Sequence, residues 1–111
     1  MRILKNKNNM IVLENGEWTY LISYETPIAK VNNTIKADQH ESKYGLYFTS
    51  SWNYSQTTLK QLYEFIGLYT TQRDENDNMF AYMLDNAKNK KEYLQKQIEL
   101  GNIKMVKEIE F

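Results

Sequence analysis

The hydrophobic pattern of this chain changes its period over residues 54–59. Before that segment Tyr44, Leu46 and Phe48 alternate with other residues, as in a strand that buries one face. After it, apolar residues recur at the three- and four-residue spacing of an amphipathic helix. Those residues are Leu59, Leu62, Tyr63 and Ile66. A strand that leads directly into a helix with one apolar face predicts a mixed α+β domain.

Turn signals ahead of this segment predict an antiparallel meander. The Asn-rich segment 5–9 separates the apolar runs 2–4 and 10–13, which indicates a hairpin turn. Asn15-Gly16 is typical of a two-residue type I′ loop. A strand over 17–24 then places Trp18, Tyr20, Ile22 and Tyr24 on one face and Thr19, Leu21 and Ser23 on the other.

Pro27 lacks a backbone donor, so we expect 25–27 to end that strand and another strand to begin at Ile28. The polar segment 32–43 then predicts an exposed loop.

Capping residues predict where the helices begin and end. Ser55 or Thr57 can cap the first helix, which we expect to end near Tyr69. Asp77 opens a short second helix around 79–84. Asn89 caps a third helix, and Gly101 stands where a left-handed residue ends it.

The last residues, 103–111, alternate as an edge strand would, and a helical tail is the competing interpretation. At 111 residues the chain suits one domain over 1–111. We therefore predict an α+β fold in which an antiparallel β-meander of four to five strands packs on an amphipathic helix. Two shorter helices and a C-terminal strand should follow.

The composition excludes several classes of protein. With no cysteine, disulfides, thiolate nucleophiles and Cys-ligated metal centres are ruled out, which favours an intracellular protein. The 14 basic and 14 acidic residues give a net charge of zero, so no overall field attracts nucleic acid or membranes. No apolar run is long enough to span a bilayer. We expect a soluble, cytoplasmic protein without a cofactor.

The candidates for catalysis are few. The only histidine, His40, lies between Asp38 and Glu41, and one short segment of this kind is more typical of a solvated loop than of a metal site. Ser55 is better explained as a helix cap than as a nucleophile, because the chain has a single histidine to serve as an activating base and no glycine stands beside Ser55. The sequence thus predicts a protein that is not an enzyme.

Residues 21–29 are Leu-Ile-Ser-Tyr-Glu-Thr-Pro-Ile-Ala, and residues 54–58 are Tyr-Ser-Gln-Thr-Thr. These two segments resemble those of a group of small phage and mobile-element proteins without an established activity. In that group the helix commonly continues with a basic residue and a histidine; here Lys60 matches the first, and Gln61 stands in place of the second. The resemblance implies an accessory protein of phage origin and a β-then-α order.

An accessory protein of this kind without catalytic groups commonly acts by covering the surface of a host protein. The leading hypothesis is therefore non-catalytic protein binding in the host cell, with a defence complex such as a CRISPR effector nuclease as the target. Tyrosine is enriched at protein interfaces, and acidic residues can imitate phosphate toward a basic channel. The predicted partner-binding residues are Tyr69, Asp74, Glu75, Asp77, Tyr82 and Tyr93.

Two alternatives remain open. In the first, the third helix binds single-stranded nucleic acid through a cluster of lysines and one aromatic ring, although Glu92 interleaves with them. Those residues are Lys88, Lys90, Lys91, Tyr93 and Lys96. Strand aromatics such as Trp18 and Tyr47 also suit base stacking, but core packing competes for them. In the second alternative, the strand over 103–111 pairs across a two-fold axis to form a homo-oligomer.

Overall fold

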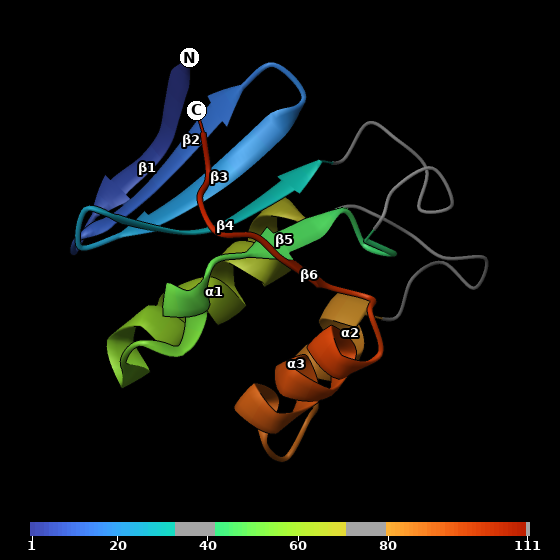
Figure 1. Cartoon of the computed structure of the whole chain (residues 1–111). Helices are drawn as coiled ribbons and strands as arrows, with labels where there is room; N and C mark the ends of the chain where they lie inside the picture. The colour runs from blue at the N-terminus through green and yellow to red at the C-terminus, as the bar shows by residue number, and fades with distance from the viewer. Residues whose placement is uncertain (33–41, 71–79, 111) are drawn as a thin grey trace.

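A computed structural model describes residues 1–32, 42–70 and 80–110. These residues build an α+β fold around one six-stranded sheet in which the strands lie in the order of the sequence (Figure 1). The strands are β1 (Arg2–Lys7), β2 (Met10–Asn15), β3 (Trp18–Ser23), β4 (Thr26–Asn32), β5 (Leu46–Phe48) and β6 (Lys104–Met105). Strands β1 to β5 pair antiparallel, as predicted for the meander, whereas β6 runs parallel to β5.

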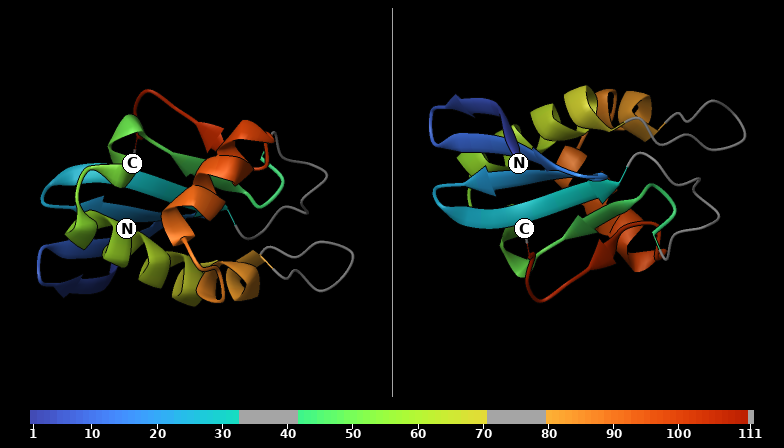
Figure 2. Two further views of the ribbon diagram at one scale, coloured as in Figure 1. Left: turned by 90° about the horizontal axis from the view of Figure 1, so that it is seen from below. Right: turned by 90° about the horizontal axis from the view of Figure 1, so that it is seen from above.

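The parallel pair explains where the helices lie. Parallel neighbours need a crossover connection, and here the connection from β5 to β6 contains every helix in the described residues. These are the 3-10 helix η2 (Ser50–Asn53) and the α-helices α1 (Gln56–Tyr69), α2 (Phe80–Asp85) and α3 (Lys90–Glu99). The α-helices lie on the same side of the sheet, and the other side faces away from them (Figures 1 and 2).

The core lies between this helical layer and the sheet. The apolar face of α1 is dry, since Leu62, Phe65 and Ile66 are fully buried and Leu59 is 5% exposed. The sheet residues in the same core cluster include Val12, Leu21, Ala29, Val31, Leu46 and Phe48. Burial of each large apolar side chain contributes about 1.5–3 kcal/mol, so α1 holds its place chiefly by packing.

The first two turns between strands differ from the predictions. Strand β1 continues to Lys7, so the first turn is Asn8-Asn9 alone, with both φ angles positive. Asparagine tolerates this left-handed conformation because its short side chain can bond locally. The next turn is Gly16-Glu17 rather than Asn15-Gly16, and of these residues only Gly16 has a positive φ, at +63°. A type I′ turn needs two positive values, so that prediction was wrong.

Pro27 does not separate two strands as predicted. Strand β3 ends at Ser23, and Tyr24-Glu25 form the turn with positive φ at both residues. Strand β4 starts at Thr26 and includes Pro27, at the point where a bulge shifts the β3–β4 register. A bulge relieves Pro27 of the ladder hydrogen bond that it cannot donate.

The helix caps agree with the sequence. The Ser55 side chain accepts a hydrogen bond from the Thr58 amide, and Asn89 does the same for the Glu92 amide. At the end of α3, Gly101 has φ +79° and donates to the Ile98 carbonyl, while Asn102 donates to Gln97. This pair of bonds is a Schellman motif.

The predicted loop over 32–43 and the predicted strand over 103–111 both differ from expectation. Asn32 belongs to β4 and is buried rather than exposed, and residues 33–41 of that expected loop lie outside the described residues. The C-terminal strand exists, but it is only Lys104–Met105. After it the Val106 amide donates to the Phe48 carbonyl, and the segment to 110 continues without helix or strand.

Candidate functional site

A hollow opens where α1 meets α2 and the first residue of α3. It measures about 270 Å³. Its lining is Tyr63, Gly67, Ala81, Tyr82, Leu84, Asp85 and Lys90. The two helices that supply most of this lining also expose large apolar side chains, because Tyr82 is 60% exposed, Met83 49% and Leu68 63%. We call the hollow with these three residues the helical surface.

Of the predicted partner-binding tyrosines, the structure places one on this surface. Tyr82 lines the hollow. Tyr69 is half-buried with its ring centroid 5.7 Å from that of Phe65, and Tyr93 is half-buried 6.0 Å from Phe80. Burial also raises the pKa of the Tyr93 hydroxyl above its ordinary value. These two rings therefore pack on core residues. The sequence alone did not distinguish this packing role from a role on the surface.

The predicted acidic contacts Asp74, Glu75 and Asp77 lie outside the described residues. So do Asp38, His40 and Glu41, the segment weighed as a metal site. Within the described ranges, no group of three or more His, Asp or Glu residues is placed to hold a metal ion.

The predicted nucleic-acid residues of the third helix differ in exposure. Lys88, Lys91 and Lys96 are exposed, but Lys90 is half-buried and lines the hollow. The Tyr93 ring contacts the buried Phe80 ring and is half-buried, so binding of nucleic acid through this helix stays a prediction. Glu92, which interleaves with these lysines, forms no ion pair with Lys96 among the described residues.

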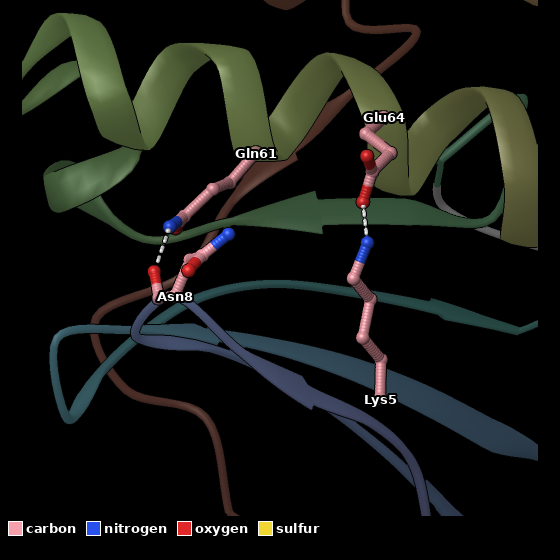
Figure 3. A network of polar contacts seen from close by, with 4 residues as sticks. All are labelled: Lys5, Asn8, Gln61 and Glu64. Carbon is pink, nitrogen blue, oxygen red and sulfur yellow. Dashed lines mark hydrogen bonds and ion pairs between the residues drawn. The ribbon is translucent and has the colours of Figure 1, made fainter.

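A polar network that the sequence did not predict ties β1 to α1 (Figure 3). Lys5 forms an ion pair with Glu64, and the Gln61 side-chain amide donates to the Asn8 carbonyl at 3.1 Å. The oxygen of the same side-chain amide, Gln61 Oε1, is buried without a hydrogen-bond partner. In each of these two contacts the partners are more than 50 positions apart in the sequence, and no local pattern signals such contacts.

Segments 21–29 and 54–58 meet at a cluster of hydroxyl groups. Ser23, at the end of β3, lies with its Oγ 3.1 Å from Thr58 Oγ1 on α1. Ser55 Oγ also lies 3.1 Å from Thr58 Oγ1. The motif therefore joins the sheet to the first turn of α1, and its serine and threonine residues have a structural role.

The side of the sheet that faces away from the helices carries a second cluster. Lys30 Nζ lies 4.2 Å from the ring centroid of Trp18 and 5.4 Å from that of Tyr47. The two rings are themselves in edge contact, with centroids 5.6 Å apart. Of the strand aromatics considered for base stacking, Trp18 and Tyr47 are thus half-exposed, whereas Trp52 is buried in the core.

The chain belongs to a protein family described as a family of unknown function (DUF8033), whose model matches residues 2–81. The match runs from β1 to the start of α2, and α3 and β6 lie beyond it. A search of curated proteins found no match to the chain, and a search of solved structures found none either. No helix in the described part of the chain has the length and apolar character needed to cross a membrane.

Proposed function

We propose that the protein acts without catalysis, by binding another protein through its helical surface. The observation that carries this proposal is the exposed Tyr82 ring beside an open hollow of about 270 Å³. Tyrosine and methionine are enriched at protein interfaces, and the strongest contacts there are apolar side chains that enter well-formed pockets.

The chemistry of the hollow describes the partner. Tyr63, Ala81 and Leu84 provide an apolar wall that suits an aliphatic or aromatic side chain of the partner. Asp85 and Lys90 place one negative and one positive group at the same hollow, where they can bond polar groups around that side chain. Leu68 on α1 and Met83 on α2 follow the lining residues Gly67 and Tyr82 in the sequence and add exposed apolar area.

The proposed partner is a protein of the host cell, and a host defence nuclease is the first target to test. The support for this choice is the resemblance of 21–29 and 54–58 to phage and mobile-element proteins. The helical surface itself supports only protein binding.

The test is capture from host lysate with the tagged full chain, after nuclease treatment. Tyr82→Ala should lose a captured protein that the wild type retains. Tyr54→Ala is the matched control, because Tyr54 is 81% exposed but precedes α1 and is not part of the hollow. Equal capture by both variants would refute the proposed surface. A capture without nuclease treatment that recovers nucleic acid and no protein would refute protein binding.

A further inference from the structure

The strand register places a row of alternating aromatic and lysine residues across the side of the sheet opposite the helices. Tyr20 pairs with Lys30, Lys30 pairs with Tyr47, and Tyr47 pairs with Lys104. Directly paired residues point to the same face, so these four side chains follow one line from β3 to β6. Trp18, two residues before Tyr20, is on the same face.

The strands contribute only basic charges to this face, although the chain as a whole is neutral. Of the strand residues that the register places on this face, Lys30 and Lys104 are the only charged ones. Lys104 Nζ lies 3.9 Å from the position that a Cβ on Gly101 would take, at the end of α3, so Lys30 is the cation at the aromatic rings. Glu17, in the loop before β3, accepts a hydrogen bond from Asn32 at 3.0 Å and so lies at one end of this face.

The C-terminal segment limits how much of the face is open. After β6 it rises on this side of the sheet (Figure 1). Ile109 in this segment and Tyr20 on β3 are both buried, and neither belongs to the main core cluster. Glu108 and Glu110 in the segment are exposed. Trp18, Lys30 and Tyr47 remain half-exposed, and they form the part of the face that a ligand can reach.

We infer that this face binds single-stranded nucleic acid at the cluster of Trp18, Lys30 and Tyr47. Aromatic rings on an open sheet stack with unpaired bases, and nearby lysines bind the phosphates that connect them. The three strands that carry the cluster span roughly 10 Å, which suits about two bases. Bases in a duplex are already stacked on each other and cannot reach the rings, so single strands are favoured. This inference does not rest on the helical surface.

The test is a titration of the full chain with short oligodeoxythymidine at about 50 mM salt, followed by tryptophan emission. Trp52 is 4% exposed, so quenching should report on Trp18. We expect saturable quenching, no competition from duplex DNA, and an affinity that falls as salt rises. Absence of saturable quenching would overturn the inference.

Variants locate the site. Trp18→Ala should weaken binding roughly tenfold, measured by anisotropy of a labelled oligonucleotide. Lys30→Gln should weaken it and lower the slope of log affinity against log salt by about one. Lys91→Gln on α3 is the charge-matched control and should bind as the wild type does.

If Trp18→Ala fails to fold, Lys30→Gln decides alone, because its side chain is on the surface of the same cluster. Wild-type affinity and salt slope in Lys30→Gln would overturn the inference. So would a loss in Lys91→Gln as large as the loss in Lys30→Gln.

Discussion

Replacing Thr58 by valine should destabilise the protein by about 2 kcal/mol, because it breaks the buried hydrogen bond between the sheet and α1. Thr58 is 1% exposed and Ser23 is 2% exposed, with their hydroxyl oxygens 3.1 Å apart. Valine is close to threonine in shape, so the packing changes little. The Ser23 hydroxyl is left buried without this partner, and an unsatisfied buried polar group costs about 1–3 kcal/mol.

A double-mutant cycle separates this pair from other contacts. Ser23→Ala alone should lower the free energy of unfolding by less, about 1 kcal/mol, because the Thr58 hydroxyl keeps Ser55 Oγ as a partner at 3.1 Å. Ser23→Ala with Thr58→Val should cost about 2 kcal/mol rather than the sum of about 3, because the double variant has no Ser23 hydroxyl to leave unpaired. Urea unfolding followed by circular dichroism measures each free energy. Thr57→Val is the control, since Thr57 is exposed on the same turn and should change stability by less than about 0.5 kcal/mol. Additive costs, or an equal effect of Thr57→Val, would refute the reasoning.

Three further predictions concern stability and can be measured by the same unfolding experiment. Gly101→Ala should cost about 1–2 kcal/mol because φ is +79° there, whereas Gly67→Ala inside α1, with open space around the added Cβ, should gain about 0.5–1 kcal/mol; equal effects would contradict both assignments. Gln61→Glu should cost about 1–3 kcal/mol at pH 7, because it removes the donor to Asn8 and buries a carboxylate, and the deficit should shrink in acid; a deficit that does not change with pH would contradict this. Burial raises the pKa of Tyr20, Tyr63 and Tyr93, so the unfolded chain loses these protons first and stability should fall as the pH rises above about 10; an unchanged unfolding midpoint there would contradict it.

The fold class could be predicted because strong local signals agree with the tertiary structure. The change of hydrophobic period marked α1, and its buried residues Leu59, Leu62 and Ile66 follow the predicted spacing. Ser55, Asn89 and Gly101 act as the caps that their types favour. Each of these signals depends on residues within a few positions of one another.

Features that depend on distant residues could not be predicted. The parallel pairing of β6 with β5 joins segments more than 50 positions apart, and a two-residue strand carries almost no periodic signal. Pro27 is tolerated inside β4 because of a register shift with β3, which local propensity does not reveal.

The candidate site could be predicted only in part, because it too depends on contacts between distant residues. Tyr82 and Tyr93 have the same side chain and similar local surroundings, so sequence alone could not tell which one packs on Phe80. Tyr82 is exposed because the short α2 turns it away from the core residues Phe80 and Leu84. The cluster of Trp18, Lys30 and Tyr47 forms only through the pairing of β3, β4 and β5.

Site-specific photo-cross-linking in the host cell tests the proposed protein binding most directly. Benzoylphenylalanine is placed at position 82 in one variant and at position 54 in another, so that both probes replace an exposed tyrosine. We predict a discrete adduct with one host protein from position 82 and none from position 54. No adduct from position 82, or the same adducts from both positions, would contradict the account.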